Sequence, residues 1–226
     1  MPIQLNSSIT AVLESFQENF GFRLLHHPNL CPENVLNSKQ CLPRQDVTVH
    51  ALHPYKLWLN QEQPVFQKMR LWLLDKGIML VKYPTDNITY YLVVPIIPVE
   101  LATAFHATSR RNLESIMEKG LLPGDSANGI ASSGNRFDCE GNIYVCPTLG
   151  NPEDAGQRCT FSAHWWRDHK SKESDDKDWI IIRLDRLNII PGLITNRDYM
   201  SNSGVILTGV EHIPSNQITV AWPSNE

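Results

Sequence analysis

The chain has 226 residues, of which 42% are hydrophobic and 19% charged, and its formal net charge is −4. This composition is typical of a globular protein with a substantial core, and it argues against a generally basic nucleic-acid binder. The five cysteines have no CxxC spacing, which argues against a disulfide framework or a zinc ribbon and favours reduced thiols in the cytosol.

The first residues (Met-Pro-Ile-Gln-Leu-Asn) lack a basic segment followed by an apolar run, so we expect no signal peptide. The longest apolar stretch, residues 90–99, is interrupted by Pro95 and Pro98 and is shorter than the roughly 20 residues of a membrane span. We therefore expect no membrane association. The predicted location is cytoplasmic, unless the chain is an effector delivered without a readable signal.

Residues 1–98 predict a helical or mixed lobe. Apolar side chains recur at helical spacing in two segments. Pro64 suits the first turn of the second helix, and Gly77 ends it. No motif there indicates chemistry, so this lobe receives no predicted role. The predicted elements are a helix capped by Ser7-Ser8 that reaches Phe20, a helix over residues 64–76, and strands over residues 78–83 and 88–94.

Pro95 and Pro98 mark a predicted boundary, after which residues 99–226 form a second domain. Several short strands with few long helices predict an α+β fold on a split or bent sheet. The predicted strands cover residues 102–106, 142–146, 179–184, 205–208 and 217–221, and the predicted helices lie over residues 109–119 and within residues 153–164.

Two local features refine this prediction. Ser109 is a candidate cap for the helix over residues 109–119, and Gly120 is expected to close that helix in the left-handed conformation. The charged run at residues 169–177 is typical of a solvated loop.

The first segment that indicates chemistry reads Phe-His-Ala-Thr at residues 105–108 and Asn-Leu-Glu-Ser-Ile-Met-Glu-Lys-Gly-Leu-Leu-Pro at residues 112–123. A neutral imidazole at a strand end offers one donor and one acceptor to a diol. This pattern resembles the ADP-ribosyltransferases related to diphtheria toxin and the poly(ADP-ribose) polymerases. Those enzymes have a His-x-Thr strand followed by a helix that ends in Gly-Leu.

The resemblance implies an ADP-ribosyltransferase-type split β-sheet domain that binds NAD as a substrate. It implies that His106 bonds the adenosine ribose hydroxyls, that the backbone beside it, at Ala107, holds the nicotinamide carboxamide, and that Thr108 steadies the site. Leu122 joins these residues in the predicted NAD-binding set.

A second segment, residues 141–145 (Gly-Asn-Ile-Tyr-Val), resembles the polymerases' Gly-x-Gly-Ile-Tyr-Phe strand. The resemblance implies that Tyr144 stacks on nicotinamide, and an aromatic face suits a flat, partly cationic ring. Asn142, also assigned to the NAD site, replaces a glycine of the usual pattern. A strand tyrosine packed in a core is the alternative interpretation of Tyr144.

The C-terminal residues 199–218 most closely resemble the RNA 2′-phosphotransferases, which share the NAD-binding fold and have a Ser-x-Asn-Gly-Val-Trp-Leu-Thr strand. Those enzymes also place a substrate-binding arginine in a Gly-x-Arg context, which corresponds here to Arg158. A guanidinium at this position suits a phosphate as a bidentate fork. Arg158 is therefore the predicted substrate-binding residue.

One departure concerns catalysis. Transferases that modify proteins or DNA carry a glutamate at the start of this last strand, where the present chain has Ser203, Gly204 and Val205. Glu211, on the loop after the strand, is the nearest acid and completes the predicted catalytic set with His106 and Tyr144. The scattered histidines have no partners at metal-ligand spacing, so we expect no metal.

These observations predict an NAD-dependent ADP-ribosyltransferase, a glycosyltransferase that moves ADP-ribose to a protein or nucleic-acid acceptor and releases nicotinamide. Two alternatives remain. One is an RNA 2′-phosphotransferase-like enzyme that uses NAD as phosphate acceptor, and the other is a non-catalytic module that binds ADP-ribose or a partner.

Overall fold

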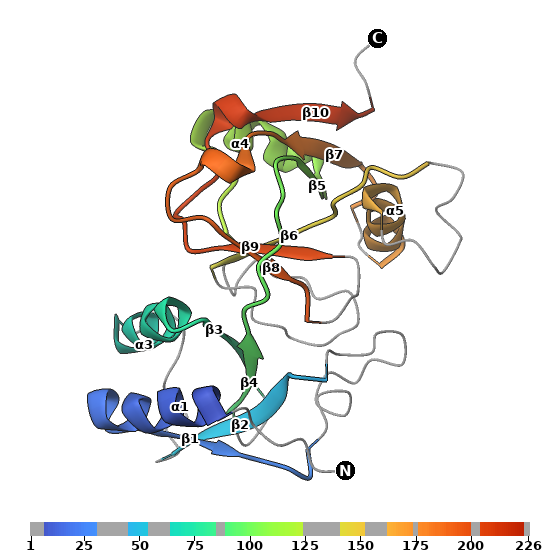
Figure 1. The fold of residues 1–226 in the computed structure, drawn as a ribbon. Coiled ribbons are helices and arrows are strands. Elements are labelled where there is room, and N and C mark those ends of the chain that lie inside the picture. Colours follow the sequence, from blue (N-terminus) through green and yellow to red (C-terminus); the bar gives the residue numbers. More distant parts are fainter. Residues whose placement is uncertain are drawn as a thin grey trace. The chain divides into compact units, whose positions relative to one another are not determined.

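The fold is that of a computed structural model, which describes residues 7–30, 45–53, 64–84, 89–123, 141–151, 162–173, 176–199 and 204–223. The chain divides into two compact units, one taking the described residues up to Ile96 and the other beginning at Ile97. Each unit mixes helices with small antiparallel sheets, as the α+β prediction requires (Figure 1). None of the described helices is long and apolar enough to cross a bilayer.

The first unit places two helices on one face of a four-stranded antiparallel sheet with the order β1-β2-β4-β3. Phe16, Met69 and Leu73 of the helices pack there against Leu52 and Val93 of the strands, and all five side chains are buried. The elements are α1 (Ser7–Phe20), β1 (Arg23–His26), β2 (Thr48–His53), α3 (Pro64–Asp75), β3 (Ile78–Pro84) and β4 (Thr89–Pro95).

The two helices and the β3–β4 pair confirm the sequence predictions for this unit. Strands β1 and β2 were not predicted. β1 has only four residues, too few for a clear sequence pattern, and β2 is buried at five consecutive positions, so it lacks the alternation of a half-buried strand. Their pairing with β4 and with each other makes them strands.

The second unit contains two three-stranded antiparallel sheets, ordered β10-β7-β5 and β6-β9-β8. They meet at one bridge, where Phe105 and Cys146 exchange two backbone hydrogen bonds of 2.8 Å each. On either side of this pair of residues the two sheets separate, so together they form a split sheet. The elements of the second unit are β5 (Ala104–Ser109), η1 (Arg110–Asn112), α4 (Leu113–Lys119), β6 (Asn142–Val145), α5 (Ala163–Glu173), β7 (Trp179–Leu184), η3 (Leu187–Ile189), β8 (Ile194–Arg197), β9 (Val205–Thr208), η4 (Ser215–Gln217) and β10 (Ile218–Trp222).

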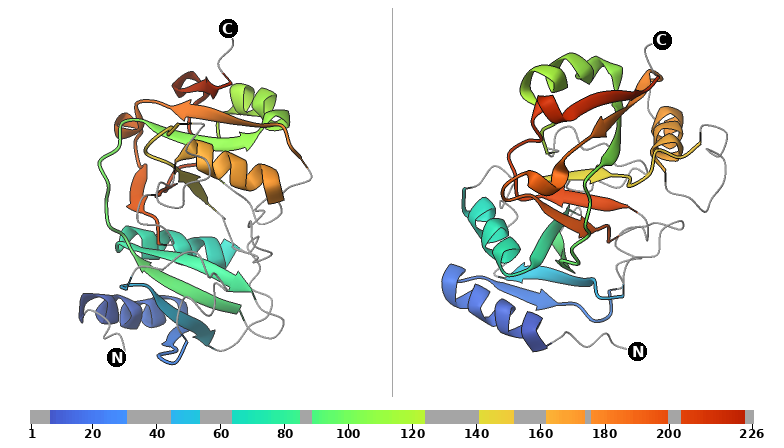
Figure 2. Two further views of the ribbon diagram at one scale, coloured as in Figure 1. Left: turned by 90° about the vertical axis from the view of Figure 1, so that its right-hand side faces the viewer. Right: turned by 45° about the horizontal axis from the view of Figure 1, so that its top comes forward.

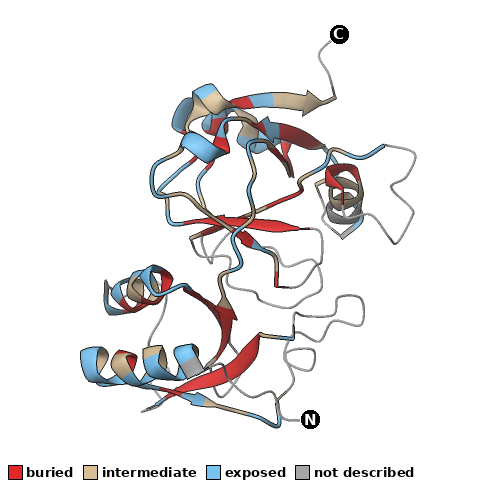
Figure 3. Ribbon diagram, in the orientation of Figure 1, coloured by how far each residue is buried: buried red, intermediate tan, exposed pale blue. Residues whose placement is uncertain are grey.

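Helices α4 and α5 cover opposite faces of the β10-β7-β5 sheet (Figure 2). Ile180 and Ile182 of β7 belong to the same core cluster as Ile116 of α4. Ile181, between them, packs with Ala163 of α5. Because successive strand side chains alternate, the buried residues of β7, which is drawn largely as buried in Figure 3, face both sides of the sheet.

Four local expectations need correction. Ser109 makes no side-chain cap bond, and the chain first forms η1 before α4 begins at Leu113. Gly120 has the expected positive φ of 86°, but its ψ of 173° is extended rather than helical. Helix α5 continues to Glu173, within the run predicted as a loop. Strand β8 was not predicted at all.

Candidate functional site

His106 and Tyr144 meet where the sheet splits. His106 lies on β5 next to the Phe105–Cys146 bridge, and its Nδ1 is 2.8 Å from the carbonyl oxygen of Tyr144 on β6. A carbonyl only accepts, so Nδ1 carries the proton. A neutral ring in this tautomer offers Nε2 as an acceptor. The side chain of His106 thus joins the two sheets at the point where their backbones separate.

The backbone of Ala107 faces the same split. Phe105 directs its N–H and C=O to Cys146, and Arg110 N–H donates to Asp178 O of the β7 side at 2.9 Å. Since backbone groups alternate along an antiparallel strand, Ala107 shares the edge of Phe105. Among the described residues, no group outside strand β7 makes a hydrogen bond with the N–H or the C=O of Ala107. One donor and one acceptor therefore lie side by side beside His106.

The hydroxyl group of Tyr144 is held by a second tyrosine. Its oxygen is 3.2 Å from the hydroxyl oxygen of Tyr199, which follows β8 and is fully buried. Tyr144 itself is half-buried. Sequence analysis did not assign Tyr199 to the site, because its contact with Tyr144 depends on how β8 and β9 pair.

The face of the β6-β9-β8 sheet that carries Tyr144 is polar. Tyr144 stands opposite Ile206, and Ile206 opposite Asn196, so these three side chains share a face. Asn142 lies on the same face, two residues before Tyr144. Asn196 is fully buried, and its Oδ1 accepts a bond of 2.6 Å from Ile97 N–H.

Two buried amide atoms on this face have no hydrogen-bond partner in the described structure: Asn142 Oδ1 and Asn196 Nδ2. Buried polar atoms are nearly always paired, and an unmet one costs about 1–3 kcal/mol. This face is therefore suited to a polar group that supplies both a donor and an acceptor.

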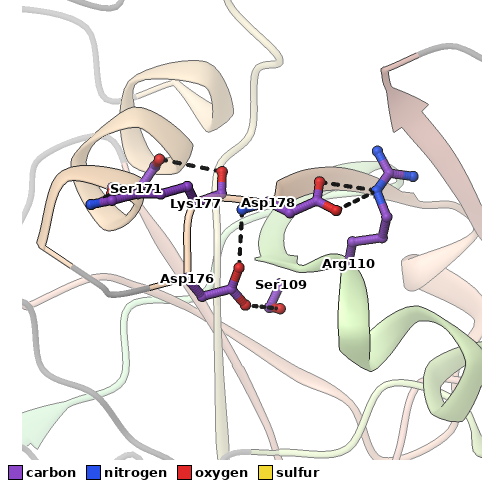
Figure 4. A network of polar contacts seen from close by, with 6 residues as sticks. All are labelled: Ser109, Arg110, Ser171, Asp176, Lys177 and Asp178. Carbon is purple, nitrogen blue, oxygen red and sulfur yellow. Dashed lines mark hydrogen bonds and ion pairs between the residues drawn. The ribbon is translucent and has the colours of Figure 1, made fainter.

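Thr108 is buried and accepts a hydrogen bond of 3.3 Å from Asn112 Nδ2, which links β5 to η1. Beside it, Ser109 donates to the Asp176 carboxylate, and Arg110 Nε is 3.0 Å from both oxygens of Asp178 (Figure 4). The Ser109 hydrogen bond is the main cause that lowers the pKa of Asp176, with the Asp178 amide and Arg111 adding to it. These bonds anchor the end of β5 to the turn before β7.

The remaining predicted residues lie elsewhere. Glu211 is exposed on the loop after β9, near the backbone bridge between Leu121 and Ile213, and no hydrogen bond in the described structure joins it to His106 or Tyr144. Leu122 is 56% exposed next to the same bridge. Arg158 lies outside the described residues.

A cavity of about 440 Å³ opens near the first residue of β5. Asp185 and Arg186 of the β7–η3 corner line it with Thr103 and Gln217, and neither His106 nor Tyr144 contributes. Among the described residues, no group of three or more His, Cys, Asp or Glu side chains could hold a metal ion.

No protein-family model matches the chain, and no curated protein sequence matches it.

Proposed function

We propose that the second unit is an ADP-ribosyltransferase-type domain that binds NAD and transfers ADP-ribose to a protein or nucleic acid with release of nicotinamide. The observation that carries this proposal is the hydrogen bond from His106 Nδ1 to Tyr144 O across the split of the sheet. The two motif residues lie far apart in the sequence, yet they occupy adjoining positions of one site. The two three-stranded sheets that meet at a single bridge also support this fold type.

The backbone of Ala107 supports nicotinamide as the bound group. A carboxamide has one C=O acceptor and one NH₂ donor, which complement an N–H and a C=O at the same strand edge. Tyr144 supplies an aromatic face nearby, and its hydroxyl is held by Tyr199. The pyridinium ring of NAD is flat and cationic, so such a face attracts it.

A histidine that binds both hydroxyls of a ribose diol uses both of its ring nitrogens. In this proposal His106 would use only one of them for the ribose. Its Nδ1 donates to Tyr144 O, so Nε2 of the neutral ring would accept a hydrogen bond from a ribose hydroxyl. Catalysis would depend mainly on position, because bound NAD is held with its glycosidic bond against the polar face of the β6-β9-β8 sheet.

The proposal is tested by incubating the protein with NAD labelled in the adenosine moiety and a whole-cell lysate. We expect labelled macromolecules and free nicotinamide with the wild type. His106→Ala should lower kcat/KM about tenfold or more. It removes the hydrogen bond that would position the ribose of NAD, and such a bond is worth about 1–2 kcal/mol. His212→Ala, an exposed histidine of the same unit, is the matched control and should retain activity.

Equal labelling by the wild type and His106→Ala would show that the proposed site is wrong. Loss of a terminal 2′-phosphate from RNA, with no ADP-ribose attached to macromolecules, would favour the 2′-phosphotransferase alternative. Background nicotinamide release together with measurable ADP-ribose binding would favour a binding module.

A further inference from the structure

The β8–β9 ladder continues one residue beyond the strands. Arg197 stands opposite Val205, and the next residue, Asp198, donates its N–H to Gly204 O at 3.0 Å. Side chains alternate along a strand, so Asp198 shares the face of Asn196. That is also the face of Tyr144. Asp198 therefore occupies the row next to Tyr144 on the polar face of the sheet.

Gly204, which precedes the central strand β9, lies in this row between Asp198 and Cys146. The β6–β9 register pairs Val145 with Val205, so its next step sets Cys146 beside Gly204. The central strand contributes no side chain here, because the residue is glycine. A carboxylate on Asp198 can reach across this gap toward β6. Gly204 belongs to the segment, Ser203 to Val205, that corresponds to the glutamate position of the transferases that the sequence resembles.

The electrostatics of Cys146 agree with this position. Burial raises the pKa of the Cys146 thiol to about 12, and the negative charge of Asp198 adds to the rise. Because Coulomb interactions weaken with distance and with intervening water, this effect agrees with the row that the strand register assigns to Asp198. Cys146 exchanges both backbone hydrogen bonds with Phe105, the neighbour of His106.

Tyr199 gives a third constraint. It follows Asp198 directly, is fully buried, and holds the Tyr144 hydroxyl at 3.2 Å. The chain therefore bends over the polar face immediately after Asp198. The hydrogen bond of Asp198 to Gly204 and that of its neighbour Tyr199 to Tyr144 together restrict where Asp198 lies.

We propose that Asp198 is the catalytic carboxylate of the site and takes, from the neighbouring strand, the place of the glutamate that the transferases resembled by this sequence carry at the start of their last strand. This inference rests on the proposed function. It transfers the catalytic role from Glu211, which is exposed on the loop after β9, to a half-buried acid two residues beyond Asn196.

The proposed reaction uses a carboxylate in two steps. When the bond between nicotinamide and the ribose C1 breaks, its electron pair leaves with nicotinamide and positive charge develops on the ribose, which a facing carboxylate stabilises. The acceptor oxygen or nitrogen then bonds to that carbon and gives up its proton, which the same carboxylate accepts. The products are the ADP-ribosylated acceptor, nicotinamide and one proton.

The test compares nicotinamide release and NAD binding by the full chain and four variants. Asp198→Asn should lower kcat about a hundredfold, the effect of losing a general base or an electrostatic stabiliser. Its Kd for NAD should stay within about threefold, because the acid acts on the transition state. Asp198→Glu keeps the carboxylate and should retain at least a tenth of the rate. Glu118→Gln, an exposed acid on α4, is the neutral control, and Glu211→Gln tests the competing acid.

A second measurement does not depend on activity. The alkylation rate of Cys146, followed by peptide mass mapping, should rise several-fold in Asp198→Asn, because removing a nearby negative charge favours the thiolate. No change at Cys146 would contradict the position assigned to the carboxylate.

The outcomes separate the two proposals. If the wild type releases nicotinamide and Asp198→Asn does so equally, or if only Glu211→Gln abolishes the activity, the role of Asp198 is overturned and the proposed function stands. If the wild type neither binds nor cleaves NAD with any lysate, both are overturned.

Discussion

His50 is a fully buried histidine in the sheet of the first unit. Its Nδ1 donates to Leu24 O at 3.2 Å, and its Nε2 is 2.9 Å from Thr48 Oγ1, so the hydroxyl donates to a neutral ring. The ring of His26 lies 5.2 Å away on the neighbouring strand. Every one of these contacts suits the uncharged imidazole, and a proton on Nε2 would break the bond from Thr48.

Burial is the main cause that lowers the pKa of His50 from 6.5 to about 4. The charges of His26 and His27 also lower this pKa, whereas the hydrogen bond to Leu24 raises it. A lowered pKa means that the neutral side chain stabilises the fold above pH 6.5. This stabilisation is lost as the pH falls from 6.5 toward 4, by up to about 1.4 kcal/mol per pH unit.

We therefore predict that amide hydrogen exchange in β2 and β4 accelerates progressively between pH 6.5 and 4, after correction for intrinsic rates. His50→Gln, which keeps an amide donor and acceptor but does not titrate, should be less stable at pH 7 and should show a flatter pH dependence. Parallel pH profiles for the two proteins would contradict this role of His50.

At the scale of elements, backbone hydrogen bonds join the end of α4 to the loop after β9. Leu121 and Ile213 exchange two hydrogen bonds of 2.9 Å, and Gly120 immediately precedes this bridge. A Cβ on Gly120 would lie 2.3 Å from Ile213 O and 2.9 Å from His212 Cδ2. The glycine is thus required by close approach as well as by its φ of 86°.

We predict that Gly120→Ala lowers the free energy of unfolding of the second unit by about 1–3 kcal/mol, as strained backbone and displaced contacts do. Gly77→Ala is the matched control, because its φ of 76° is similar while nothing lies within 4 Å of the added carbon. Its cost should be about 1 kcal/mol, from backbone strain alone. Urea denaturation measures both. Equal costs would show that the bridge tolerates a side chain.

On the scale of the whole molecule, each unit has its own hydrophobic core. Phe16, Met69 and Leu73 belong to that of the first unit, and Ile180, Ile182 and Leu207 to that of the second. The residues assigned to the site, from His106 to Asp198, all belong to the second unit. Substitutions in the core of the first unit therefore test whether its stability can be changed apart from the activity proposed for the second.

We predict that Leu73→Ala, at a fully buried position of α3, destabilises the first unit by about 2–5 kcal/mol through the cavity it leaves. Hydrogen exchange in α1 and α3 should report this loss. Nicotinamide release, measured below the temperature at which the variant unfolds, should match the wild type. A large fall in kcat under those conditions would show that the first unit takes part in the reaction.

The sequence by itself determined the elements whose signal is local. Helices α1 and α3 follow from apolar residues at helical spacing, and β7 and β9 follow from short apolar runs. The motif around His106 and Tyr144 is also local, because each residue stands in its own strand. These features need no knowledge of which strands pair.

Only the tertiary structure decided the rest. Strands β1 and β8 have only four residues each, and β2 lacks alternation, so hydrogen bonds to distant partners make them strands. The contact of Tyr199 with Tyr144 and the position of Asp198 beside Gly204 depend on the registers of β6, β8 and β9. Glu211 was predicted as the catalytic acid because it lies near the motif along the chain. The proposal for Asp198 rests instead on the pairing of β8 with β9, since register and not sequence distance sets which side chains share a row.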